Sequence, residues 1–135
     1  MRTLIPTLLL SIFLLTSCFE KRTSDAEEAF EYWSNLSSKN GIKILKGQYW
    51  QSAHWTKEYE VYLEIQTSPQ WVAAFVKLND LKITTSEVTR LPDDSPDWFK
   101  PRTGLKVYEP SDFSQGSIYF VDEKTGYMLF YEIQL

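Results

Sequence analysis

One stretch decides the fold, residues 55–66, which read WTKEYEVYLEIQ. Polar and apolar side chains alternate along it, which is typical of a β-strand, where successive side chains point to opposite faces of a sheet. One face holds the mainly apolar set Trp55, Tyr59, Val61, Leu63 and Ile65. The other face holds Glu58, Glu60, Tyr62, Glu64 and Gln66. The stretch therefore predicts a half-buried strand with an acidic outer face.

The neighbouring segments predict two helices and more strands. Ser24 and Glu27 have the spacing of a capping box, which predicts a helix that begins there and ends at Asn40-Gly41. Ser68-Pro69 predicts a second helix over residues 69–79, because a proline at the first helical position loses no needed hydrogen bond. Further strands are expected at residues 42–50, 81–85, 117–121 and 127–133, with Gly126 in the left-handed position of the last turn.

Residues 89–115 are expected to be irregular, because four prolines prevent regular strand pairing there. One short strand over residues 105–108 would fit inside this segment. The predicted order is helix, strand, strand, helix, strand, loop, strand, strand. We therefore expect an α+β fold, an antiparallel sheet that carries both helices on one face.

The first residues have the composition of a secretion leader. Arg2 precedes an apolar run over residues 4–15, and small or hydroxyl side chains follow the run. A helix of about twelve residues rises about 18 Å, whereas the hydrocarbon core of a bilayer is about 30 Å thick. The run is therefore too short to be a permanent membrane span.

Leu15-Thr16-Ser17-Cys18 ends this leader and resembles the lipobox of bacterial lipoproteins. The resemblance implies a diacylglyceryl group on the Cys18 sulfur, cleavage after Ser17 and acylation of the new amino terminus. It divides the chain into a signal peptide (1–17), a short membrane tether (18–23) and a single α+β domain (24–135). Since Phe19 rather than aspartate follows the cysteine, the periplasmic side of the outer membrane is favoured in a two-membrane host. Lipidation also explains a lone cysteine in an exported chain.

The charge of the chain restricts its partners. The formal net charge is −4, and removal of the leader with Arg2 makes it one unit more negative. Nucleic acids select basic surfaces, so no nucleic-acid partner is predicted. Lys21 and Arg22 follow the lipidation site closely, and they either contact lipid head groups or remain solvated.

Glu58, Glu60 and Glu64 are the first candidate site. Alternate residues of a strand lie about 6.6–7 Å apart on one face, and carboxylates at such a separation can act as acid and base in glycoside cleavage. The alternative is that they form the solvent side of a sheet.

Asp93, Asp94, Asp97, Trp98 and Phe99 are the second candidate site. Tryptophan is a favoured binding anchor, and long irregular segments of compact domains are usually functional or disordered. Alternatively, both rings fold under the loop and fill the core. Calcium could bind the three aspartates, although they lack the spacing of an EF-hand.

No catalytic set or cofactor motif accompanies these candidates. His54 is the only histidine, and the sequence has no nucleophile-elbow motif and no phosphate-binding glycine loop. A zinc site would need more ligands than His54 provides, so neither a metal nor a cofactor is predicted. The sequence therefore favours a non-catalytic envelope lipoprotein that binds a protein partner, of the assembly, inhibitor or immunity type. The alternative is a protein that binds or cleaves cell-wall glycan.

Overall fold

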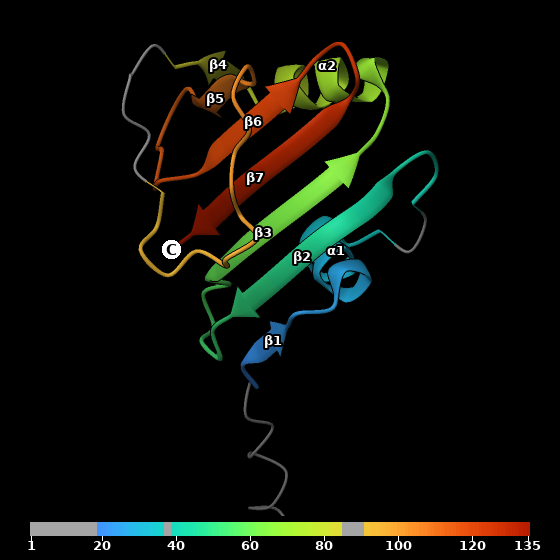
Figure 1. Ribbon diagram of the computed structural model, residues 1–135. Coiled ribbons are helices and arrows are strands. Elements are labelled where there is room, and N and C mark those ends of the chain that lie inside the picture. The colour runs from blue at the N-terminus through green and yellow to red at the C-terminus, as the bar shows by residue number, and fades with distance from the viewer. Residues whose placement is uncertain (1–18, 37–38, 85–90) are drawn as a thin grey trace, which may run out of the picture.

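The computed structural model describes residues 19–36, 39–84 and 91–135, and within them the chain folds as a seven-stranded antiparallel sheet with two helices (Figure 1). The prediction of a mixed α+β fold with an antiparallel sheet is thereby confirmed. The elements are β1 (Lys21–Thr23), α1 (Ala26–Ser34), β2 (Lys43–Gln51), β3 (Tyr59–Gln66), α2 (Pro69–Leu78), β4 (Leu81–Ile83), β5 (Lys106–Pro110), β6 (Ile118–Asp122) and β7 (Tyr127–Gln134). Their order across the sheet is β1-β2-β3-β7-β6-β5-β4.

The observed element order differs from the prediction by two short strands. β1 lies in the segment expected to be a tether, and it pairs with the edge of β2, Arg22 opposite Trp50. β5 lies in the segment expected to be irregular, at the position raised for one short strand. β1 contains only three residues, too few to show an alternation, and its pairing is decided by the neighbouring strand.

The first helix begins one residue later than predicted and ends earlier. Asp25, not Ser24, is the N-cap, and its side chain accepts a hydrogen bond from the Glu28 amide at 2.9 Å. The helix ends at Ser34, because Asn35 takes a left-handed conformation with φ 58°. The second helix begins as the Ser68-Pro69 pair predicts, with the Ser68 hydroxyl accepting from the Trp71 amide at 3.1 Å.

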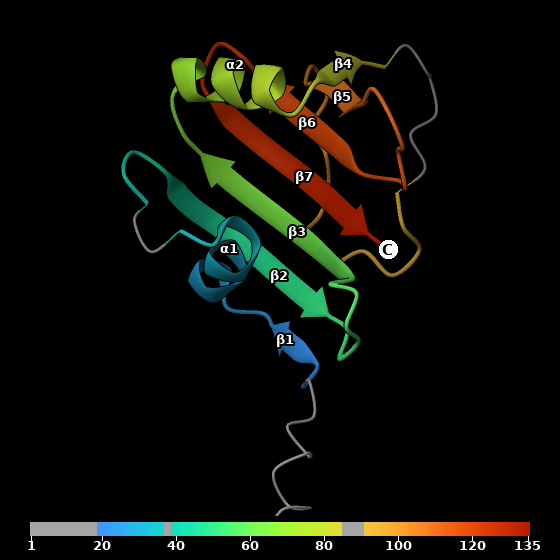
Figure 2. The same cartoon turned by 180° about the vertical axis from the view of Figure 1, so that it is seen from behind.

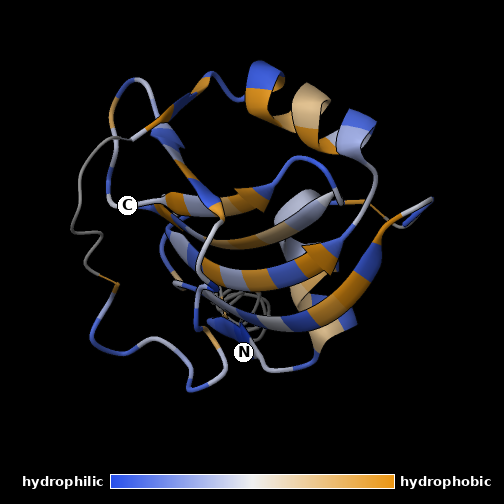
Figure 3. Cartoon of the chain, turned by 45° about the horizontal axis from the view of Figure 1, so that its top comes forward, coloured by the Kyte–Doolittle hydropathy of each residue, from blue (hydrophilic) through white to orange (hydrophobic). Residues whose placement is uncertain are grey.

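Both helices pack on the same face of the sheet, as the two opposite views show (Figures 1 and 2). Trp33 of α1 contacts Phe75 of α2, with ring centroids 6.0 Å apart, and it also contacts Phe130 of β7 at 5.0 Å. The core under the helices contains Ala29, Phe30, Tyr49, Val61, Leu63, Ile65, Val72, Leu81, Tyr108, Tyr119, Val121, Met128 and Phe130. Hydrophobic and hydrophilic residues alternate along the central strands that supply it (Figure 3).

The opposite face of the sheet is also covered, so the expectation of a half-buried β3 is wrong. Tyr62 is only 3% exposed, and its ring meets the ring of Phe99 edge-on at 5.0 Å. Phe99 belongs to the segment between β4 and β5, which crosses this face. A second core forms there from Tyr62, Phe99, Ile118, Phe120, Tyr127, Leu129 and Tyr131.

The strand predicted over residues 55–66 is also shorter than expected. β3 begins at Tyr59, so Trp55 and Glu58 lie in the loop before it. The amide of Ser52 donates to the carbonyl of Glu58 at 2.9 Å and closes this loop. Trp55 is therefore not part of the core, and its side chain is 99% exposed.

Candidate functional site

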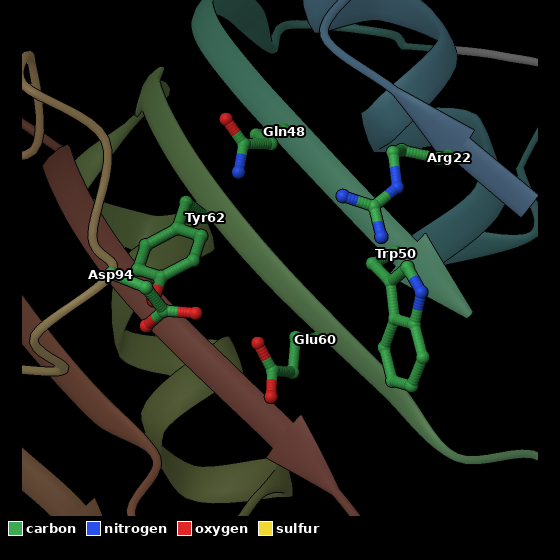
Figure 4. A pocket seen from close by; sticks show the side chains of 6 residues that line it. All are labelled: Arg22, Gln48, Trp50, Glu60, Tyr62 and Asp94. Carbon is green, nitrogen blue, oxygen red and sulfur yellow. The ribbon is translucent and has the colours of Figure 1, made fainter. Parts of the chain in front are cut away.

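A pocket of about 240 Å³ lies on the face of the sheet opposite the helices. Its walls come from β1, β2, β3 and the segment that crosses that face (Figure 4). The side chains that line it are Arg22, Gln48, Trp50, Glu60, Tyr62 and Asp94.

Strand register aligns five of these side chains. Arg22 lies opposite Trp50, and Trp50 lies opposite Glu60, so these three form one row across β1, β2 and β3. Gln48 lies opposite Tyr62 and forms the next row along the strands. Because alternate residues of a strand share a face, both rows point to the same side of the sheet.

Asp94 reaches the pocket from residues 91–105. Two turns shape this part of the chain: the Ser95 amide donates to the Pro92 carbonyl at 3.1 Å, and the Phe99 amide donates to the Pro96 carbonyl at 2.8 Å. The Phe99 ring, 2% exposed, fixes the segment to the second core. Figure 4 shows the Asp94 carboxylate beside the Tyr62 side chain.

The two carboxylates of the pocket have no basic partner. Among the residues that the structure describes, no lysine or arginine nitrogen lies within 4.0 Å of Glu60 or Asp94. Burial, and next the charge of Asp94, raise the pKa of Glu60. Within residues 19–36, 39–84 and 91–135, Glu60 and Asp94 therefore lack a direct ion-pair partner, while Arg22, the basic residue of the lining, is paired with Glu20.

The Tyr62 hydroxyl has a similarly unsatisfied environment. Its oxygen is buried and makes no hydrogen bond of standard geometry within the described part of the chain, although the Asp94 carboxylate lies close enough to interact with it. Burial, and next the Asp94 carboxylate, raise the pKa of this phenol, so the hydroxyl remains protonated. Because this oxygen is not accessible, Tyr62 contributes its ring rather than its hydroxyl to the wall of the pocket.

Arg22 and Trp50 are held at the rim by a third acidic residue. Glu20 accepts hydrogen bonds from the Arg22 guanidinium at 3.0 Å and from the Trp50 indole nitrogen at 2.7 Å. These bonds, first from Arg22 and then from Trp50, lower the pKa of Glu20. The positive charge of Arg22 is thus compensated outside the pocket, and the indole ring keeps one orientation.

The three glutamates of the first candidate site do not act as one group. Only Glu60 lies in the pocket. Glu64 accepts a hydrogen bond from the Tyr127 hydroxyl at 2.9 Å, and Glu58 lies in the loop before β3 beside Thr56. The alternation of β3 places Glu60 and Glu64 on one face, but Glu60 lies near Asp94 of the segment 91–105 whereas Glu64 is bonded to Tyr127 of β7.

The residues of the second candidate site separate in a similar way. Asp94 lines the pocket, Asp97 is exposed, and Asp93 borders a shallower hollow with Leu91 and Tyr131. Phe99 fills the second core, and Trp98 is half-buried with the Lys46 ammonium 5.9 Å from its ring centroid. Within residues 19–36, 39–84 and 91–135, no three His, Cys, Asp or Glu side chains converge as metal ligands.

Sequence reasoning missed Arg22 and Gln48 as members of the site. Arg22 was placed in the tether, and nothing in a three-residue strand reveals its pairing with β2. The alternation of β3 did point to Glu60, and the second candidate site included Asp94. The lipobox cysteine, Cys18, lies outside the described residues.

Comparison with known proteins adds no relative. No family model, no curated protein and no solved structure matches the chain. In the part that the structure describes, neither helix has the length and apolar character needed to cross a bilayer.

Proposed function

We propose that the chain is a lipid-anchored protein of the bacterial envelope whose domain binds a protein partner without catalysis. The lipobox-like Leu15-Thr16-Ser17-Cys18 supports the anchor, and Phe19 after the cysteine favours the periplasmic side of the outer membrane. The acidic pocket is the surface offered to the partner. A lysine or arginine side chain of that partner binds in the pocket, against Glu60, Asp94, Trp50 and Tyr62.

The single observation that carries this proposal is the pair of uncompensated carboxylates beside two aromatic rings. A cationic group placed there would lie between Glu60 and Asp94 and offset part of their negative charge, with the indole face of Trp50 beside it. Gln48 would hydrogen-bond the backbone of the partner near that side chain. These are the chemical groups that recognise a basic residue.

The size of the pocket favours one side chain over a free small molecule. Small-molecule sites usually occupy roughly 300–1,000 Å³. This pocket, about 240 Å³, is smaller and opens on a sheet face rather than in a deep cleft. A protein partner would contribute the rest of its affinity from contacts around the rim.

Affinity capture with a pocket variant tests the proposal. The acylated protein is purified from solubilised membranes of its host, as the native chain and as E60Q/D94N. We expect the native chain to recover a basic protein in stoichiometric amount. The variant should recover it with an affinity reduced about 30-fold or more, because removing one side of a buried charge pair costs about 2–5 kcal/mol.

A matched variant controls for the loss of negative charge. E109Q/D112N removes one glutamate from β5 and one aspartate from the loop after it. β5 lies near the opposite edge of the sheet from β1. It should recover the partner as the native chain does. Equal recovery with E60Q/D94N, or no stoichiometric protein in any sample, would contradict the proposal.

One observation favours a second candidate function, glycan cleavage. Glu60 has a raised pKa, Asp94 supplies a second carboxylate, and the Trp50 ring could stack on a sugar. In this reading Glu60 is the general acid. Cell-wall fragments incubated with the protein would then show new reducing ends, which E60Q would abolish and E58Q would leave unchanged. Absence of new reducing ends with the native chain excludes this candidate.

A further inference from the structure

We propose that the end of the sheet where β1 begins rests on the bilayer, with Trp55 inserted at the boundary between head groups and acyl chains. This inference depends on the proposed lipidation of Cys18. It adds an orientation of the domain and a second membrane contact.

Strand pairing brings Trp55 to the end of the sheet where the anchor leaves. Lys21, the first residue of β1, pairs with Gln51, the last residue of β2. The loop between β2 and β3 begins immediately after Gln51 and contains Trp55. Figures 1 and 2 both show β1 and this loop at the same end of the sheet.

The chain between the lipidated cysteine and the sheet is too short to hold this end far from lipid. Two residues, Phe19 and Glu20, separate Cys18 from Lys21, and the three steps from one Cα atom to the next span about 10 Å when fully extended. The seven-residue loop, folded back on itself, projects no more than about 12 Å from the strand ends. Trp55 and the anchor can therefore reach the same bilayer surface.

The exposed side chains at this end have the chemistry of a membrane interface. Trp55 is 99% exposed and Phe19 is 81% exposed, although both are large aromatic residues. His54 and Lys57 lie close to Trp55 in an exposed loop, and Lys21 is exposed two residues after Phe19, with Glu20 between them. Tryptophan and basic residues are enriched where proteins meet lipid head groups.

Quenching by brominated lipid tests the insertion. Acylated full-length protein is reconstituted into vesicles whose phospholipids carry bromine on the acyl chains near the head groups. We expect partial quenching of tryptophan fluorescence in the native chain. Trp55→Ser should lose the quenched part of the emission.

A second tryptophan variant provides the control. Trp71 lies in α2, which begins beyond the opposite end of β3, and it stacks on Phe75 at 5.2 Å. Trp71→Phe should therefore keep the quenching of the native chain. Thermal unfolding of both variants shows that the fold is retained.

The outcomes separate this inference from the lipidation on which it depends. Mass spectrometry of the same preparation reports acylation, and only acylated protein enters the comparison. Acylated protein whose quenching is equal in native chain and Trp55→Ser overturns the insertion while leaving the anchor intact. A blue shift of Trp55 emission that grows with protein concentration in lipid-free detergent also overturns it, since this would identify a second copy as the occupant.

Discussion

Glu60 connects the fold to the proposed function, because β3 positions it and its carboxylate lines the pocket. It lies on the central part of the sheet because β3 alternates, and its ionised form is disfavoured because burial and Asp94 both act on it. A hydrophobic residue here would pack against its neighbours at no electrostatic cost. Retention of a carboxylate at this position is what a binding pocket for a cation requires.

The raised pKa of Glu60 predicts a pH-dependent difference between the native chain and Glu60→Gln. A carboxyl whose folded pKa lies above its unfolded pKa contributes stability below the unfolded value, and this is lost as pH rises through the folded value. Glutamine cannot ionise. The free energy of unfolding of the variant, relative to the native chain, should therefore be larger at about pH 7 than at about pH 4.

Urea denaturation of both chains at several pH values measures this difference. Glu109→Gln serves as the control, because Glu109 is remote from the pocket. A difference for Glu60→Gln that is constant with pH would show that Glu60 is not disfavoured in its charged form.

Gly126 occupies a position where we expect any side chain to destabilise the fold. It has φ 78°, and an added Cβ would lie 2.2 Å from the carbonyl oxygen of Thr67. Gly126→Ala should lower the free energy of unfolding by about 2 kcal/mol or more, from left-handed strain and backbone contact together. Gly104→Ala, where φ is 87° and the space is open, should lose only the strain of about 1–2 kcal/mol. Equal losses in thermal or urea unfolding would contradict this reasoning.

The segment of residues 91–105 behaves as a structural element although it contains no helix or strand. Phe99 anchors it between Tyr62 and Phe120, with ring centroids 5.0 Å and 6.3 Å away. This single ring positions Asp94 over the pocket. The same segment therefore completes the second core and the candidate site.

Phe99→Ala should consequently destabilise the domain by about 3–5 kcal/mol, as for other buried phenylalanines. Phe113, which is 98% exposed, provides the comparison, and Phe113→Ala should change the stability by no more than about 0.5 kcal/mol. Denaturant unfolding measures both. A Phe99→Ala variant as stable as Phe113→Ala would mean that the segment does not depend on this ring.

The elements that could be predicted from the sequence were those with a repeated polar and apolar pattern or a clear cap or turn signal. β3 and the hairpin of β6 and β7 alternate over five or more residues, and α2 carries a serine cap and proline, so their type could be read from the chain. β1 could not, because three residues show no pattern and the strand forms on the edge of β2, whereas the sequence raised β5 only as a short strand over residues 105–108. The proximity of Glu60 and Asp94 was also hidden, since 33 residues separate them along the chain and Phe99 holds the segment of Asp94 against the sheet.

The whole molecule is a sheet with a core on each face. α1 and α2 cover one face, and the segment of residues 91–105 covers part of the other. β3 and β7 lie in the interior of the sheet, whereas β1 and β4 are its edges and contain three residues each. The region nearest the proposed anchor is thus the least stabilised by pairing.

This arrangement predicts a gradient of amide hydrogen exchange. Amides of β3 and β7 should exchange only through global unfolding, whereas those of β1 and β4 should exchange through local opening and much faster. Exchange followed by mass spectrometry or NMR measures the gradient. Protection of β1 equal to that of β7 would contradict it, unless the protein is bound to membrane, where β1 should gain protection.

The proposed envelope location and membrane contact both depend on lipidation of Cys18. The mass of the amino-terminal tryptic peptide tests this lipidation. Protein from its native host, digested with trypsin, should yield a peptide of residues 18–21 that begins at Cys18 and carries a diacylglyceryl group. A chain that still begins at Met1, with an unmodified thiol at Cys18, would contradict the anchor, the envelope location and the membrane contact of Trp55 together.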